Sequence, residues 1–300
     1  SYIINNPHSD QLSIICISTN YDWLFDEGDG IYVTGVGKTI ESRDANFNKE
    51  IEIPAHVEIF DPQGNLQVSQ ELALRMFGAF SRRREQKGFA LIARNIYGSN
   101  TIDYPLFENR DYDSYHSVIL RAGGQDSTVT KLHDIVATNL VDGTTNLEVQ
   151  AYRQCVLYID GEYFGIYNLR EKVNKHWIAQ HYGYDPENID LLVGNGSVLQ
   201  GSNKEYKELI EWCSNTNFKS DENYAQLAAK IDIDNYIDYL ISQMWVANTD
   251  TGNIKFFRER SSDPEHSKWK WIYYDFCWSF ISTQRDSVSK LSNPDGHGVG

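Results

Sequence analysis

Three polar residues in the last third of the chain have side chains suited to holding a metal ion beside phosphates. Asp250 and Asn253 share a polar loop, and Asp275 opens a later Asp-Phe-Cys sequence. Mg²⁺ prefers oxygen ligands and is usually held by one or two carboxylates together with substrate phosphates. Phosphoryl transfer also needs a group that orients the acceptor hydroxyl. These residue types predict a metal-dependent nucleotide site, although a single Asp after a helix more often caps or turns the chain.

A basic stretch in the first third of the chain could bind the phosphates. Gly78, Ser81 and Arg82 belong to a short polar loop, and Lys87 stands at the start of a hydrophobic run. Backbone amides in such a turn can surround phosphate oxygens, and a lysine on a strand can pair with them. Taken alone, this local sequence favours the simpler interpretation of an exposed hairpin.

The elements around the acidic residues can be predicted from caps and periodicity. Apolar residues recur at helical spacing in three segments, and strand-like runs follow them. The predicted helices span residues 202–213, 220–231 and 233–245, and the predicted strands span 254–258 and 269–274. Asp250 and Asn253 would therefore follow a buried helix, and a strand would end at Asp275.

The first half of the chain is predicted to be mostly β. Its expected strands span residues 12–18, 31–33, 51–60, 72–77, 88–93 and 118–121, and a helix is expected over residues 131–140. A hairpin is predicted over residues 156–169, because Asp160-Gly161 supplies the positive φ angles of a two-residue turn.

Composition excludes several classes of protein. The formal net charge of −15 argues against binding nucleic acid through its phosphate backbone, and no apolar run is long enough for a membrane span. The four cysteines lie far apart in sequence and form no C-x-x-C pair, which disfavours a zinc or redox site. They are Cys16, Cys155, Cys213 and Cys277.

Five segments together resemble the CotH spore-coat kinase family. They are residues 78–94, LRAGGQD at 120–126, YIDGEYFGIYNLRE at 158–171, NTDTGNIK at 248–255, and residues 269–280. The resemblance covers nearly the whole chain. It implies an α+β, atypical protein-kinase-like two-lobed fold with a β-rich N-terminal lobe and a helical C-terminal lobe. The domains it implies are an N-terminal β-rich extension (1–50), the β-rich lobe (51–170) and the helical lobe (171–300), the last truncated after the polar stretch 293–298.

The resemblance also implies an activity. Family members are expected to transfer the γ-phosphate of ATP to Ser of a protein substrate, with Mg²⁺ or Mn²⁺. Asp250 would be the catalytic acid of the loop, and Asn253 and Asp275 would bind the metal. Lys87 would contact the phosphates near Gly78, Ser81 and Arg82, with Arg82 or Arg94 as alternatives, and Glu171 would face the nucleotide or the metal.

Three positions depart from the family pattern. Cys277 stands where a second Asp is common, the loop from Asp250 to Asn253 is shorter than usual, and Lys131 to Asp134 replaces a common Arg-Asp pair. Loss of a carboxylate weakens the binding of hard cations, since ligand charge is a main part of their affinity.

Two other functions therefore remain open. A non-catalytic relative could bind nucleotide or act as a surface scaffold. An aromatic-rich surface could instead bind carbohydrate or protein, which grouped exposed Trp residues would favour and burial of Trp212, Trp245 and Trp271 would oppose. Export to the cell surface is expected from larger family members, with a cytoplasmic location as the alternative.

Overall fold

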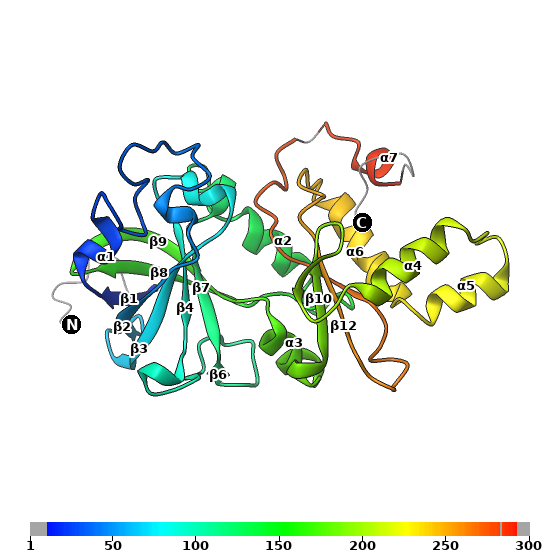
Figure 1. The fold of residues 1–300 in the computed structure, drawn as a ribbon, viewed down its shortest axis with the longest axis horizontal. Coiled ribbons are helices and arrows are strands. Elements are labelled where there is room, and N and C mark those ends of the chain that lie inside the picture. Colours follow the sequence, from blue (N-terminus) through cyan, green and yellow to red (C-terminus); the bar gives the residue numbers. More distant parts are fainter. Residues whose placement is uncertain (1–10, 283, 293–300) are drawn as a thin grey trace. The chain divides into compact units, whose positions relative to one another are not determined.

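The computed structural model describes residues 11–282 and 284–292, and the chain forms two compact units (Figure 1). The first unit combines the chain up to Lys131 with residues 151–172. The second combines residues 132–150 with the chain from Val173 onward. The family-like segments are divided between the two units, so each unit is described by itself.

The first unit is built on a closed β-barrel. In its described part, seven strands follow one another around the barrel in the order β1-β2-β3-β4-β7-β9-β8. They are β1 (Ser13–Ser18), β2 (Glu52–Phe60), β3 (Leu66–Phe77), β4 (Gly88–Ile92), β7 (Ser117–Arg121), β8 (Tyr152–Ile159) and β9 (Glu162–Glu171). The barrel closes where β1 runs parallel to β8, with Ser13 opposite Cys155; the other neighbours are antiparallel.

Alternating side chains fill the barrel. Leu74, Phe89, Leu120 and Leu157 are fully buried in one hydrophobic core, as expected when every second residue of a strand points inward. The predicted hairpin is confirmed, since Asp160 and Gly161 both have positive φ angles between β8 and β9. Small additions to this unit are α1 (Tyr21–Phe25) and the paired β5 (Ile102–Asp103) and β6 (Ser114–Tyr115).

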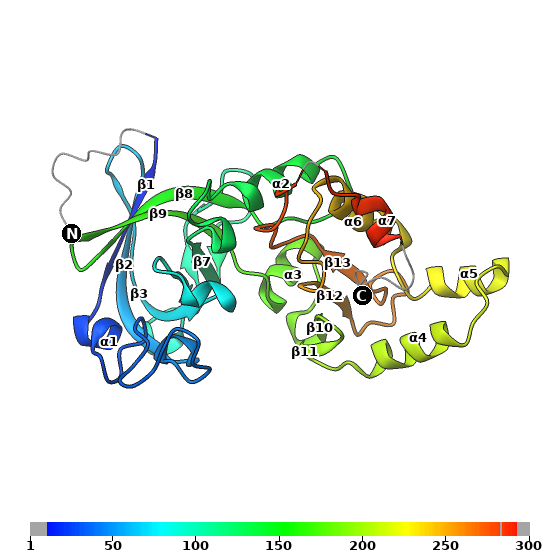
Figure 2. The ribbon, with the colours of Figure 1, turned by 90° about the horizontal axis from the view of Figure 1, so that it is seen from above.

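The second unit contains a four-stranded antiparallel sheet in the order β11-β10-β12-β13. The sheet and the helices of this unit can be followed in Figure 2. Its strands are β10 (Ile189–Val193), β11 (Ser197–Gln200), β12 (Lys255–Glu259) and β13 (Lys270–Ile272). Its helices are α2 (His133–Val141), α3 (Lys175–Tyr182), α4 (Lys204–Ser214), α5 (Asp221–Ala228), α6 (Ile233–Trp245) and α7 (Ser287–Leu291).

The expected fold class is wrong. The chain does not have a kinase-like two-lobed fold with a helical C-terminal lobe, because one unit is a closed barrel and the other is organised around a sheet. Two non-local pairings explain the difference. The first is β1 with β8, which closes the barrel, and the second is β10 with β12, which extends the β12–β13 hairpin into a larger sheet.

Local elements agree better with the sequence. The three predicted helices are confirmed as α4, α5 and α6, and Ser220 caps α5 through its side chain. The strand expected at residues 31–33 is absent there. Instead, the Ile31 and Tyr32 amides donate to the carbonyls of Trp23 and Leu24, so this segment folds back on α1. The polar stretch 293–298 lies outside the described residues.

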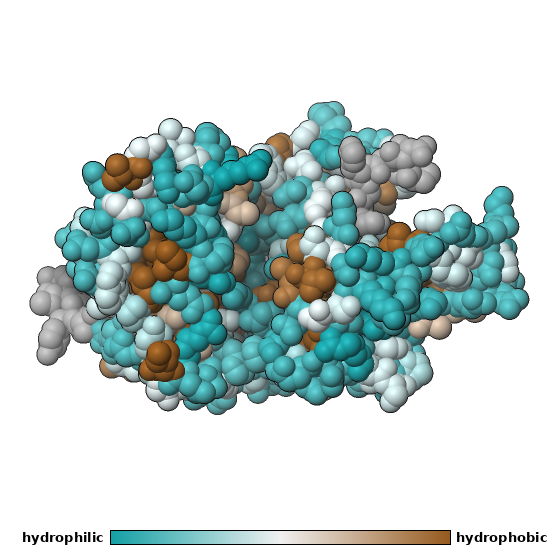
Figure 3. Space-filling view, viewed as in Figure 1, coloured by the Kyte–Doolittle hydropathy of each residue, from teal (hydrophilic) through white to brown (hydrophobic). Residues whose placement is uncertain are grey.

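The face seen in Figure 3 is largely hydrophilic, with scattered hydrophobic patches. Among the helices of the described chain, none has the length and apolar character needed to cross a bilayer.

Truncating a barrel core side chain should destabilise the first unit strongly. Leu74→Ala removes a fully buried side chain, so we expect a loss of about 2–5 kcal/mol in the free energy of unfolding. Ile96, which is 85% exposed, provides the control, and Ile96→Ala should change it by less than about 0.5 kcal/mol. Urea unfolding followed by circular dichroism measures both, and equal losses would contradict the described barrel interior.

Candidate functional site

A buried polar contact at the end of α6 fixes the start of the loop that carries Asp250. The Asn248 side chain is buried, donates from Nδ2 to Oε1 of Gln243 (2.9 Å), and accepts the Asp250 amide at Oδ1 (3.1 Å). Ala247 has a φ of +50°, a conformation that is uncommon for a residue other than glycine. The end of α6 therefore fixes where Asp250 begins its loop.

The pairing of β12 with β13 brings Asn253 and Asp275 together. Lys255 lies opposite Ile272, so the residues before β12 and those after β13 meet at the same end of the sheet. There Asn253 donates from Nδ2 to Oδ2 of Asp275 (2.5 Å), and the Tyr274 hydroxyl donates to Oδ1 of Asn253 (2.7 Å). Asp275 has a φ of +64°, and such strained residues concentrate at functional sites.

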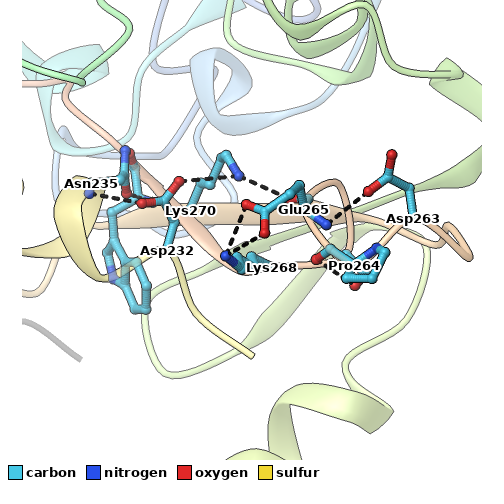
Figure 4. Close-up of polar contacts among 9 residues, drawn as sticks. Asp232, Asn235, Asp263, Pro264, Glu265, Lys268 and Lys270 are labelled. Atoms are coloured by element: carbon cyan, nitrogen blue, oxygen red, sulfur yellow. Dashed lines mark hydrogen bonds and ion pairs between the residues drawn. The ribbon is translucent and has the colours of Figure 1, made fainter. Parts of the chain in front are cut away.

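A second contact holds α6 against β13; Figure 4 shows Asp232, at the start of α6, between Asn235 and Lys270. The buried Asn235 side chain accepts the Trp271 amide at Oδ1 (2.7 Å) and donates to the Trp271 carbonyl (3.2 Å). Asp232 caps the helix by accepting the Asn235 amide (3.0 Å), and its other oxygen lies 3.3 Å from Nζ of Lys270. Because α6 leads to Asp250 and β13 leads to Asp275, this brace fixes both halves of the site.

Asp134 is a positioning residue that sequence reasoning missed. It is buried in the first turn of α2 and accepts the amide of Phe276, the residue after Asp275, at 2.7 Å. The sequence showed Asp134 only as half of an altered Arg-Asp pair, and an Asp at a helix start is normally explained by capping. The departure from the family pattern was the one signal that marked this position.

The charges of the site suit a hard cation. Partial burial, and then the negative charge of Asp275, raise the pKa of the Asp250 carboxyl, while a hydrogen bond from Asn253 opposes the shift. The Asp275 carboxylate and the Asn253 amide supply oxygen donors of the kind that Mg²⁺ and Mn²⁺ accept, and the Asp250 carboxylate adds negative charge beside them. Within residues 11–282 and 284–292, no group of three or more His, Cys, Asp or Glu side chains could hold a metal.

The predicted phosphate loop joins β3 to β4 in the first unit. Gly78 has a φ of +111°, and a Cβ atom there would lie 2.2 Å from the Ser81 hydroxyl oxygen, so the turn favours glycine. The loop borders an open hollow of about 450 Å³. Its lining residues are Arg43, Asn48, Glu50, Gly78, Ala79, Phe80, Arg82 and Arg83.

Arg82 and Lys87 occupy different surroundings. The buried Arg82 guanidinium donates to Glu50 (2.7 Å) and contacts the carbonyls of Phe47 and Asn48. Lys87 is also buried; its Nζ donates to the Arg84 carbonyl (2.6 Å) and lies over the rings of Tyr32 and Phe47. Burial lowers the pKa of Lys87. A phosphate contact by Lys87 stays a prediction.

Glu171, at the end of β9, is the centre of a buried network. Its carboxylate accepts from Arg110 (3.0 Å), from the Tyr112 hydroxyl and from the Ala151 amide (2.7 Å). Burial and the Glu171 charge raise the pKa of Tyr112 well above its usual range. These contacts secure Glu171 within the first unit, and its predicted orientation toward nucleotide or metal stays a prediction.

A comparison with protein families identifies the family of this chain. A family model described as CotH kinase protein matches residues 74–298, which include both the β3–β4 loop and the Asp250 and Asp275 loops. This chain belongs to the CotH kinase family. The resemblance stated from the sequence motifs is therefore confirmed. No curated protein matches the chain.

Replacing Asp250 by an uncharged isostere should stabilise the second unit at neutral pH. The folded-state pKa of Asp250 is raised, so its charged form disfavours folding above that pKa, and the penalty disappears below the pKa of the unfolded chain. Asp250→Asn should therefore raise the unfolding midpoint at pH 7, and the gain should vanish in acid. Thermal melts across pH measure this, with the exposed Asp263→Asn as a control. A lower midpoint at pH 7 would contradict the described surroundings of Asp250.

Proposed function

We propose that this chain is an atypical kinase that transfers the γ-phosphate of ATP to Ser of a protein substrate and requires Mg²⁺ or Mn²⁺. The observation that supports it most is the convergence of Asp250, Asn253 and Asp275 on two adjoining loops of a CotH kinase family member. Three buried polar side chains, Asn235, Asn248 and Asp134, hold these loops in place. They keep Ala247 and Asp275 in uncommon backbone conformations, of the kind that concentrate at functional sites.

Each residue of the site has a proposed role. Asp250 would accept a hydrogen bond from the Ser hydroxyl and orient it for attack; its raised pKa makes it a better proton acceptor than an ordinary Asp. Asn253 and Asp275 would hold the metal, which when bound would neutralise charge on the transferred phosphate. Tyr274 orients the Asn253 amide, and Asp134 fixes the backbone beside Asp275.

The first unit would bind the nucleotide. Gly78 and Arg82 line the open hollow, and Ser81 lies against Gly78, so the proposal assigns these three to the phosphates of ATP. Lys87, directly before β4, and Glu171, at the end of β9, are proposed to support this site.

One observation favours a second candidate, a relative that binds nucleotide without transferring phosphate. Cys277 is buried, with 2% of its surface exposed, and it offers no oxygen ligand where family members commonly have an Asp. The tryptophans give weaker support to a third function, a surface that binds carbohydrate or protein. Trp271 is buried and Trp212 partly buried, whereas Trp245 is 65% exposed beside Phe280.

ATP binding should depend on the metal and on Asp275. Calorimetry of the whole chain with Mg²⁺ or Mn²⁺ should show binding that weakens by at least about tenfold in Asp275→Ala, because a charged ligand to the cation is lost. Glu265→Ala removes an exposed carboxylate in the same unit and should leave binding unchanged. Absence of ATP binding by the wild type would reject the proposed function and its non-catalytic alternative.

Phosphotransfer should depend on Asp250 more than binding does. With labelled ATP and Ser-rich peptides, Asp250→Asn should lower the rate by roughly 10²–10⁴-fold, the usual contribution of a positioned proton acceptor, while changing ATP affinity little. Equal rates in the wild type and Asp250→Asn would remove Asp250 from the reaction. Metal-dependent ATP binding without any transfer would favour the second candidate.

A further inference from the structure

Basic side chains gather on the outer side of the barrel around β3 and β9. Arg75 lies between Leu74 and Met76, which both point into the core, so strand alternation directs Arg75 outward. Lys172 directly follows β9, and its charge interacts with Arg75 and Arg94. This gathering of positive charge occurs in a protein whose net charge is −15.

Carboxylates balance this positive charge only in part. Glu50 is shared, lying 3.2 Å from Arg75 and 2.7 Å from Arg82, and Glu52 pairs with Arg94. Two carboxylates thus lie among four cationic side chains, so positive charge is in excess. The four are Arg75, Arg82, Arg94 and Lys172. Such an excess attracts anions.

Two arginines in this cluster have buried donors without an acceptor. Nε of Arg75 and Nε of Arg82 are both buried, and neither has a hydrogen-bond partner among the described residues. Burial, and then the charge of Arg75, lower the pKa of Lys172 to about 8, against the opposing effect of Glu52. Buried donors without acceptors cost free energy, which a multi-oxygen anion would recover.

We propose that Arg75, Arg82 and Lys172 form a phosphate-binding site for which the Glu50 carboxylate competes. Glu50 is suited to be displaced, because its side chain is 58% exposed, whereas those of Arg75 and Arg82 are 25% and 10% exposed. The Glu50 carboxylate lies beside Arg75 and Arg82, and its charge also acts on Lys172. A phosphate in its place would face the same three cations and offer them more acceptor oxygens and more charge.

The position of Glu50 connects this site to the hollow beside Gly78, whose lining includes both Glu50 and Arg82. The inference therefore rests on the proposed function in taking the phosphate to be that of ATP. The lysine that binds the phosphate in this proposal is Lys172 and not Lys87, because Nζ of Lys87 already donates to a carbonyl and faces two aromatic rings. Free phosphate has the same chemistry and is distinguished by the test.

Titration calorimetry of the whole chain with ATP, pyrophosphate and inorganic phosphate tests the site. Lys172→Met should weaken binding of ATP and pyrophosphate by about tenfold, the effect of one charge-assisted hydrogen bond, and Lys172→Arg should restore most of it. Glu50→Gln should strengthen binding several-fold, a gain that misfolding cannot produce. The control is Glu71→Gln, which removes the charge of a carboxylate on β3 that pairs with His56, and it should have no effect.

The outcomes separate this inference from the proposed function. Effects on ATP and pyrophosphate alone would identify a nucleotide phosphate as the ligand, and equal effects on inorganic phosphate would identify a general phosphate site. If the affinity for ATP is the same in the wild type, in Lys172→Met and in Glu50→Gln, the inference is overturned, while the kinase proposal is unaffected. If ATP does not bind, but pyrophosphate binds and its affinity changes in Glu50→Gln, the proposed function is wrong and the phosphate site is supported. If none of the three ligands binds, both proposals are wrong.

Discussion

The antiparallel pairing of β12 with β13 is the constraint on which the candidate site depends. The register that sets Lys255 opposite Ile272 also sets the chain before β12 beside the chain after β13. Asn253 and Asp275 then meet within hydrogen-bond distance, although neither lies inside a strand. A shift of one residue would turn alternate side chains to the opposite face of the sheet and separate the pair.

Buried polar side chains make this register specific. Asn235, Asn248 and Asp134 are each buried, and each bonds to a backbone group near the site. Leaving a buried polar group unpaired costs about 1–3 kcal/mol, so alternative packings of α6 and α2 against the sheet are disfavoured. The same contacts allow Ala247 and Asp275 to keep backbone conformations that a less constrained loop would relax.

Charge imbalance is the second theme of the molecule. In the second unit, Asp250 and Asp275 are neighbouring carboxylates whose mutual repulsion contributes to the raised pKa of Asp250. In the first unit, Arg75, Arg82 and Lys172 share too few carboxylates. Both arrangements reduce the stability of the folded chain, and a ligand of opposite charge would relieve each one. Charge arrangements that lower the stability of the folded state are typical of functional sites.

Signals within the sequence were sufficient to predict the local elements and to identify the family. Helical periodicity located α4, α5 and α6, the Asp-Gly pair located the β8–β9 turn, and the motifs identified the CotH kinase family. These signals act between residues close in sequence, where caps, turns and side-chain period are decided by local geometry. Four features became visible only in the folded chain: the closure of the barrel by β1 and β8, the sheet around β10, the role of Asp134 and the cluster at Glu50. Each depends on contacts between residues far apart in the chain, as between Asp134 and Phe276, and no local preference encodes which distant partners will meet.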